Sequence, residues 1–138
     1  MRGEQVLLQF VENPKLDARD VAELRSAVGW DAERKRLEKV VGYTYMTAAC
    51  FADNQLVGFV DVMSDGLDDA LIRGLVVHPA YQRRGIGLKL LQMVISQTKK
   101  DDIKTTNVLF DPELSDFYQK AGFKIICGGI IENETEGF

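Results

Sequence analysis

The sequence predicts one domain of the α/β (α+β) class, in which helices flank a mixed, mostly antiparallel central sheet. Its 138 residues are 46% hydrophobic, which suffices for one core. No internal repeat, low-complexity tract or linker divides residues 1–138. Strand-like and helix-like periodicities follow one another in the order β, α, α, β, β, β, α, β, α, β. The acidic end, residues 132–138, is expected to fray.

The N-terminal part predicts a strand followed by a helix. Residues 5–11 are apolar-rich, and Asn13-Pro14 interrupts them. Over residues 17–28 apolar side chains recur at helical spacing. Gly29 suits the end of that helix, because glycine adopts the left-handed conformation found there.

A short helix and a hairpin come next. Asp31 is placed to cap a helix that carries the apolar residues of 34–41. The β-rich runs 43–52 and 55–63 are joined by Asp53-Asn54, a dipeptide typical of a tight turn.

The centre of the chain is predicted to be a strand, a glycine loop and a helix. Residues 70–77 form the strand, which His78-Pro79 ends. Residues 85–99 form a helix with an apolar face. Its inward side chains are expected to be Ile86, Leu90, Leu91, Val94 and Ile95.

The last third predicts a strand over 105–110 and a helix opened by Asp111-Pro112-Glu113. An N-cap, a proline at the first position and an acid in the first turn favour that helix, which runs to residue 121 before Gly122. Apolar residues then predict strands over 123–127 and 129–131.

Composition excludes several classes of function. The net charge of -4 argues against nucleic-acid binding, and no run of about 18 apolar residues supports a membrane span. The start shows no secretory signal, so a cytoplasmic location is expected. One histidine and two distant cysteines, Cys50 and Cys127, argue against a metal site or a disulfide. Both thiols are expected to be reduced and buried.

Residues 73–100 contain no Asp or Glu, although the protein is acidic. A chance gap around a buried strand and helix would explain this, and so would a segment that binds an anion. The glycine loop over residues 82–87 favours the anion, because unpaired N–H groups of a helix N-terminus bind phosphate. Gly85 and Gly87 allow close approach, and Arg83 and Arg84 add charge or point to solvent.

Other glycine motifs fit this loop poorly. A dinucleotide fingerprint needs a third glycine where Leu90 stands, and a P-loop needs Lys then Ser or Thr where Leu88 and Lys89 stand. The strand, the His-Pro turn and the string Q-x-x-G-x-G instead resemble the acyl-CoA motif of the GCN5-related N-acetyltransferase (GNAT) superfamily. Residues 117–123, FYQKAGF, are similar to the second signature of that family, and the resemblance covers about residues 55–126.

The resemblance implies a GNAT-like fold whose central strands, here 70–77 and 105–110, splay apart to admit acetyl-CoA as the acyl donor, with no metal. It implies that the edge of the first strand binds the pantetheine arm and that loop amides bind the pyrophosphate. The implied cofactor-binding residues are Leu75, Val76, Val77, Gln82, Arg83, Arg84, Gly85, Ile86, Gly87, Leu88, Asp111 and Tyr118.

Tyr118 matches the tyrosine that the family places near the thioester sulfur, so it is the proposed general acid. The alternative is that Tyr118 only packs on its helix. Asp111 stands where the family often has an asparagine, and helix capping alone would also explain it.

The general base is the least defined group. Many members of the family carry a glutamate on the strand before the glycine loop or on the next one, but this chain has none there. Asp61 is the candidate base, with Asp65, Asp68 or Asp69 acting through water as alternatives. His78, next to the loop, is expected to cap or to be exposed rather than to act as a base.

The resemblance implies acetyl transfer to a primary amine by direct attack. A small-molecule acceptor is favoured, with Trp30 and Gly128-Gly129 near it, and scattered acids hint at a cationic amine. A protein lysine or N-terminal acetyltransferase and a non-catalytic acyl-CoA-binding domain are the alternatives. No nucleic-acid or membrane partner is expected, and a homodimer is expected to pair through the last strands.

Overall fold

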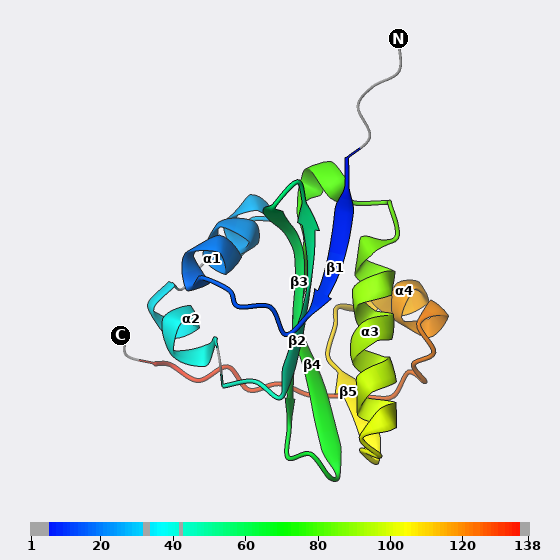
Figure 1. Cartoon of the computed structure of the whole chain (residues 1–138). Helices are drawn as coiled ribbons and strands as arrows, with labels where there is room; N and C mark the ends of the chain where they lie inside the picture. Colours follow the sequence, from blue (N-terminus) through cyan, green and yellow to red (C-terminus); the bar gives the residue numbers. More distant parts are fainter. Residues whose placement is uncertain (1–5, 32–33, 42, 136–138) are drawn as a thin grey trace.

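The computed structural model describes residues 6–31, 34–41 and 43–135 and contains a five-stranded sheet in the order β1-β2-β3-β4-β5. The first four strands are antiparallel neighbours, while β4 and β5 run parallel (Figure 1). The predicted mixed, mostly antiparallel sheet is therefore confirmed. The strands are β1 Leu8–Glu12, β2 Met46–Ala52, β3 Gln55–Ser64, β4 Asp69–Val77 and β5 Thr105–Val108.

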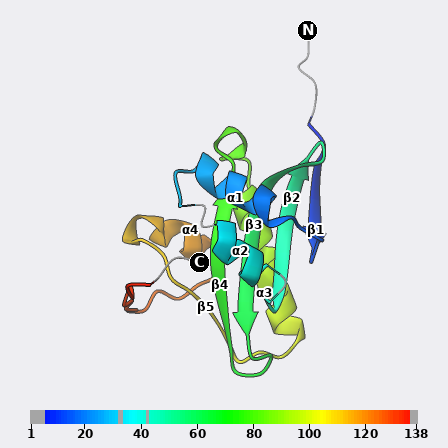
Figure 2. The same ribbon diagram turned by 90° about the vertical axis from the view of Figure 1, so that its left-hand side faces the viewer.

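Helices cover both faces of the sheet. Helices α1 (Ala18–Ala27) and α2 (Arg34–Val40) lie on one face, and α3 (Ile86–Lys100) and α4 (Ser115–Lys120) lie on the other (Figures 1 and 2). Two single 3₁₀ turns complete the fold. They are η1 (Pro79–Tyr81) and η2 (Pro112–Leu114).

The N-terminal elements follow their local signals closely. Asp17 caps α1 by accepting a hydrogen bond from the Arg19 N–H at 2.8 Å, and Gly29 follows the helix with φ of 83°. Asp53 and Asn54 both have positive φ, as a two-residue hairpin turn requires. Strand β1 begins later than residue 5, which lies outside the described residues. The predicted cap at Asp31 cannot be followed into α2, since 32–33 also lie outside them.

The predicted strands over 123–127 and 129–131 are wrong, because this described segment pairs with no strand. An apolar pattern makes a strand only where a sheet edge offers partners, and β5 supplies just four residues. The chain instead runs back from α4 towards α2, where Arg36 Nη2 donates to Thr135 Oγ1 at 2.8 Å (Figure 1). The expected homodimer depended on those strands, so it stays a prediction that the structure does not test.

The predicted helix over 111–121 is shorter than expected. It begins as η2, and only Ser115–Lys120 is α-helical. Asp111 occupies the N-cap position of η2, with the proline and the acid after it as predicted, but its side chain makes no capping hydrogen bond. The Ser115 hydroxyl bonds the Pro112 carbonyl at 2.7 Å at the junction of the two pieces.

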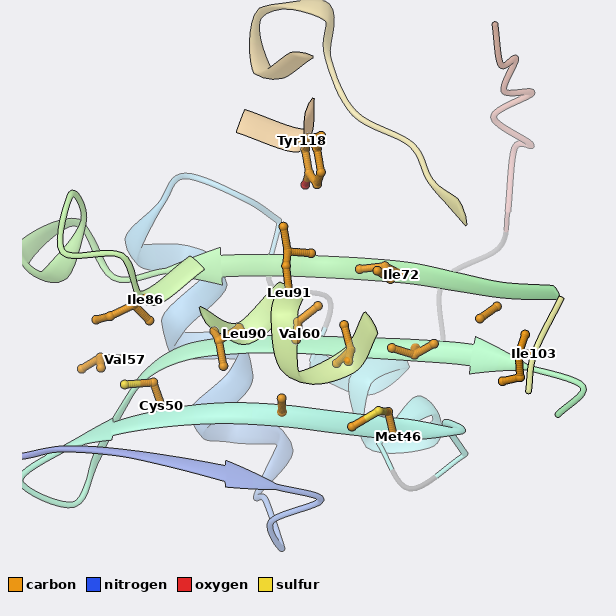
Figure 3. Packing of buried hydrophobic residues seen from close by; sticks show 14 of the residues in the cluster. Met46, Cys50, Val57, Val60, Ile72, Ile86, Leu90, Leu91, Ile103 and Tyr118 are labelled. Atoms are coloured by element: carbon orange, nitrogen blue, oxygen red, sulfur yellow. The ribbon is translucent and has the colours of Figure 1, made fainter. Parts of the chain in front are cut away.

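Two apolar clusters hold the helices to the sheet. The larger lies between the sheet and α3, where Leu90 and Leu91 are fully buried (Figure 3). Val94 of the same helix is also fully buried. Burying such a side chain stabilises the fold by about 1.5–3 kcal/mol. The smaller cluster lies under α1 and α2. Cys50 is buried as expected, but Cys127 is exposed, because the strand that was to bury it does not form.

A bulge in β4 and an early end to its pairing with β5 open the sheet beside α3. Asp61 faces Arg73 and Phe59 faces Val76, so β4 has one more residue than β3 between these pairs. Gly74, with φ of 63°, lies in this bulge. The ladder between β4 and β5 runs only from Asp69 to Ile72 on β4. The predicted splay of these two strands is confirmed.

No helix in the described part of the chain combines the length and the apolar character that crossing a bilayer requires.

Candidate active site

The loop between β4 and α3 is fixed by its own side chains. His78 Nδ1 accepts a hydrogen bond from the Ala80 N–H at 3.1 Å, so this histidine caps η1 as expected. Gln82 Nε2 donates to the Val77 carbonyl at 3.0 Å and ties the loop to the strand end. Arg83 (φ 64°) and Gly85 (φ 79°) both take left-handed conformations, which turn the chain into the helix.

This conformation leaves a run of unpaired amides. The backbone N–H groups of residues 84–88 have no hydrogen-bond partner among the described residues, and the first bond of the helix is Lys89 N–H to Gly85 O at 3.0 Å. They lie at the start of a 15-residue helix, where the dipole adds about half a positive charge. Such a group of donors suits a phosphate or pyrophosphate.

The basic stretch over 73–100 does not act as one anion site. Only Arg83 and Arg84 lie at the loop, and Arg84 is over the Tyr81 ring at 5.1 Å and reaches the Ala80 carbonyl at 3.4 Å. Lys99 and Lys100 end α3, at the other end of that helix. Arg73 instead donates hydrogen bonds to the carboxylate of Asp61.

The two sequence signatures contact each other in the structure. A Cβ built on Gly87 would lie 3.4 Å from Cζ of Phe117, so the start of α3 packs directly against α4. Phe117 meets the Tyr118 ring edge to face at 5.0 Å between ring centres. Segments 30 residues apart in sequence therefore form one site.

Tyr118 is held in an aromatic cluster. Its ring stacks on Phe110 with centres 4.4 Å apart and meets Phe123 edge to face at 5.8 Å. It is only 5% exposed, and Figure 3 shows it reaching towards Leu91 of α3. Burial raises the pKa of the Tyr118 phenol above its ordinary value of 10.0, so this group carries its proton at neutral pH.

Asp61 of β3 is the buried acid of the opposite face. Arg73 Nη2 lies 2.9 Å from Asp61 Oδ2, and Arg73 Nε lies 3.3 Å from Oδ1. Burial raises the pKa of the Asp61 carboxyl, and hydrogen bonding and charge from Arg73, with charge from Arg25, oppose that rise. A Cβ on Gly74 would lie 4.0 Å from Asp61 Oδ1, so the carboxylate adjoins the β4 bulge.

A pocket of ≈ 800 Å³ opens on the side of the sheet that α1 and α2 cover. Its lining comes from the chain after β1, from both helices and from the middle of the sheet. Asp61, Arg73 and Gly74 belong to this lining and to the bulge. The bulge therefore borders the pocket and follows directly after Ile72, the last residue of β4 that pairs with β5.

Several residues named from sequence lie away from this arrangement. Asp65 accepts hydrogen bonds from the Leu67 and Asp68 N–H groups at 2.9 Å, so it organises the turn between β3 and β4. That turn is at the far end of β4 from the glycine loop. Trp30 and Gly128-Gly129 do not line the pocket.

The sequence analysis missed Arg25 and the pairing of Arg73 with Asp61. The available signal for Arg73 was its place on a strand that pairs with the strand of Asp61. No local pattern marks Arg25, which reaches the pocket only because α1 packs on the sheet.

Comparisons with known sequences and structures found relatives of this chain. The sequence model described as an acetyltransferase (GNAT) domain matches residues 12–134. An uncharacterized N-acetyltransferase, ycf52, of Gracilaria tenuistipitata var. liui is 32% identical over 129 residues, which cover 88% of this chain and 70% of that protein.

Two solved structures share the fold at lower identity. A GNAT family acetyltransferase of Streptococcus pneumoniae has a TM-score of 0.81 at 24% identity, over 94% of this chain and 100% of that one. A GNAT family acetyltransferase of Brucella melitensis, in complex with acetyl-CoA, has a TM-score of 0.69 at 17% identity and covers 94% of both chains. This chain therefore belongs to the GNAT family and is an acetyltransferase.

Proposed function

We propose that this enzyme transfers the acetyl group of acetyl-CoA to a primary amine of a small molecule by direct attack, without a covalent enzyme intermediate. The unpaired amide run of residues 84–88 carries the proposal, because these donors suit an anion and the pyrophosphate of coenzyme A is one. In the proposal, Gln82, Arg83 and Ile86 shape this loop.

The splayed part of β4 supplies the second half of the donor site. Residues 73–77 have no β5 partner among the described residues, although Val76 and Val77 still pair with β3 on their other side. A free strand edge binds an extended chain through its backbone groups. We assign the pantetheine arm to the edge at Leu75, Val76 and Val77. Asp111, which is exposed and makes no capping bond, is assigned a contact to the cofactor.

The chemistry then follows from the groups on either side of the bulge. The amine lone pair attacks the thioester carbonyl carbon, a C–N bond forms, and an N–H of the β4 edge stabilises the oxyanion. The C–S bond breaks as Tyr118 donates its phenolic proton to the thiolate. The amine nitrogen loses its extra proton to Asp61, directly or through water, and catalysis is mainly positioning.

Asp61 suits this role by its position and its environment. It lines the pocket beside the bulge, and burial raises the pKa of its carboxyl. A carboxylate with a raised pKa accepts a proton more readily than an exposed one. We also propose a cytoplasmic location, which the two free thiols support.

Calorimetric titration with acetyl-CoA tests the donor site. The matched variants are Gly85→Glu and Gly66→Glu, since both glycines have φ of 79° and open space where a Cβ would be. We expect binding to be lost in Gly85→Glu and kept in Gly66→Glu, which lies in the turn at the far end of β4. Equal binding by both variants would contradict the assigned loop.

Release of free thiol from acetyl-CoA in the presence of primary amines tests turnover. We expect release that depends on both substrates. If the protein binds acetyl-CoA but releases no thiol from it with any amine or peptide, the chain is a non-catalytic acyl-CoA-binding domain. This result would overturn the proposal.

A further inference from the structure

The pocket on the α1 and α2 side has the opposite charge to the protein as a whole. The chain carries a formal net charge of -4, yet the described pocket lining contains five basic side chains and one acidic side chain, Asp61. The basic ones are Lys15, Arg25, Arg36, Lys39 and Arg73. A concave site with one dominant sign of charge attracts a ligand of the other sign.

Arg25 is the pocket cation with a buried hydrogen-bond donor that has no partner among the described residues. That donor is its Nε. Its guanidinium lies over the Trp30 ring at 5.7 Å and is near enough to lower the pKa of Asp61 by its charge. Arginine with unused donors in a pocket is a typical ligand for carboxylate or phosphate.

Arg73 and Lys15 also have N–H donors that remain available to a ligand. Within the described residues, Arg73 makes two side-chain hydrogen bonds, both to Asp61, and a guanidinium has five N–H donors in all. Lys15 makes no side-chain hydrogen bond or ion pair within the described residues. Its loop is fixed nearby, because Asn13 Oδ1 accepts from the Thr47 N–H at 2.9 Å. Arg36 and Lys39 have interactions of their own.

Asp61 does not balance these charges. One carboxylate faces two guanidinium groups, Arg73 in contact and Arg25 at longer range. A purely cationic amine entering this pocket would meet net repulsion. The hint from composition of a cationic acceptor is therefore not supported by the pocket that adjoins the bulge.

We propose that the acceptor is a small primary amine that also carries an oxyanion, a carboxylate or a phosphate, and that Arg25 binds this oxyanion with help from Lys15 and Arg73. The inference rests on the proposed function and narrows its acceptor. The pocket volume of ≈ 800 Å³ suits a small molecule. Bound by these groups, the oxyanion leaves the amine at the Asp61 and Gly74 end, next to the splay.

The same positive charge prepares the amine for attack. Nearby cations disfavour the charged form of an ammonium group, so a larger fraction of the bound acceptor is the free amine. This field assists Asp61, which is already engaged by Arg73. Arg25 thus acts on selectivity and on the pH profile rather than on the reacting atoms.

Matched amines test the inference on the wild-type enzyme. The probes are 2-aminoethyl phosphate against ethanolamine, and β-alanine against β-alaninamide, each assayed with saturating acetyl-CoA. We expect kcat/KM to be at least about 10-fold higher for one or both anionic members, with the difference mainly in KM. The two pairs distinguish a phosphate preference from a carboxylate preference. Equal rates for charged and neutral members, or faster acetylation of an acidic peptide N-terminus, would overturn the inference.

Arg25→Gln is compared with Arg19→Gln, an exposed arginine on the same helix that does not line the pocket. We expect Arg25→Gln to remove most of the selectivity and to shift the rise of activity with pH to higher pH, while Arg19→Gln keeps both. A structural defect would lower activity on both members of a pair alike.

A binding readout separates this inference from the proposed function. Nitrogen-15 NMR follows the Arg25 Nε–H, assigned through the Arg25→Gln spectrum, as 2-aminoethyl phosphate or ethanolamine is added without acetyl-CoA. A shift with the phosphate alone supports the oxyanion site even if acetyl-CoA does not bind, a result that would overturn only the proposed function. Intact acetyl-CoA binding with no shift and no preference for anionic amines would overturn only the present inference.

Discussion

Arg73 on β4 donates two hydrogen bonds to the carboxylate of Asp61 on β3, from Nη2 to Oδ2 at 2.9 Å and from Nε to Oδ1 at 3.3 Å. The two residues face each other where the β4 bulge begins. The Asp61 side chain is 11% exposed and that of Arg73 is 33% exposed, so the pair is sheltered on one side and open to the pocket on the other. The pair therefore has two roles: it stabilises the bulge, and it orients the carboxylate of the proposed base.

Removing Arg73 should destabilise the protein through the carboxylate left behind. We expect Arg73→Met to lower the free energy of unfolding by about 2 kcal/mol, between the values for exposed and fully buried pairs. Adding Asp61→Asn should recover about half of this loss, because no buried charge is then unpaired. Urea unfolding of both variants measures this. An additive or larger loss in the double variant would show that the pair contributes mainly by attraction.

The pH dependence of stability should report the raised pKa of Asp61. When the pKa of a carboxyl group is raised by folding, the native state holds its proton more tightly than the unfolded chain does. The stabilising contribution is therefore greatest below the unfolded value of 3.8 and is lost as pH rises through the native pKa.

The measurement compares wild type with Asp61→Asn, which cannot titrate at this position. Between about pH 4 and about pH 7, the stability of the wild type relative to this variant should fall as pH rises. An increase with pH would mean that Arg73 outweighs burial and lowers the Asp61 pKa below its ordinary value.

The two thiols should differ sharply in reactivity. Burial raises the pKa of the Cys50 thiol, an effect that the charge of Lys89 opposes, and the side chain is inaccessible. Cys127 is exposed in the segment after α4. A disulfide reagent should label one thiol per native chain rapidly and the second only on unfolding. Mass mapping that finds Cys127 slow would indicate that this segment is covered, as in a strand of the kind the sequence predicted.

The sequence predicted best what depends on neighbouring residues. The Asp53-Asn54 turn, the left-handed Gly29 after α1 and the His78 cap of η1 are each decided by a few adjacent residues, and all occur in the structure. The segment after α4 was mispredicted because Ile125, Ile126 and Ile130 have strand-like character, while a strand also needs a partner edge. No local pattern reports whether β5 supplies that edge.

The pocket proposed for the acceptor could not be predicted from local patterns, because its charges come from distant segments. Lys15 follows β1, Arg25 lies in the last turn of α1, and Arg73 lies on β4. In the sequence, Arg73 falls within the basic stretch that includes the glycine loop. Only the β3–β4 register shows that it faces Asp61 instead.

Tyr118→Phe separates catalysis from packing at the centre of the donor site. The variant keeps the stacking on Phe110 and loses only the hydroxyl, so stability should change by less than about 1 kcal/mol. If the phenol protonates the departing thiolate, kcat should fall about 100-fold while acetyl-CoA affinity stays within a factor of about 3. Tyr43→Phe, which alters a tyrosine that is 85% exposed and outside the pocket lining, should leave kcat unchanged.

Because burial raises the Tyr118 pKa above 10.0, the wild type should show no loss of activity from phenol ionisation at pH 9 or below. An unchanged kcat in Tyr118→Phe would leave the tyrosine a packing role alone and would assign thiolate protonation to water.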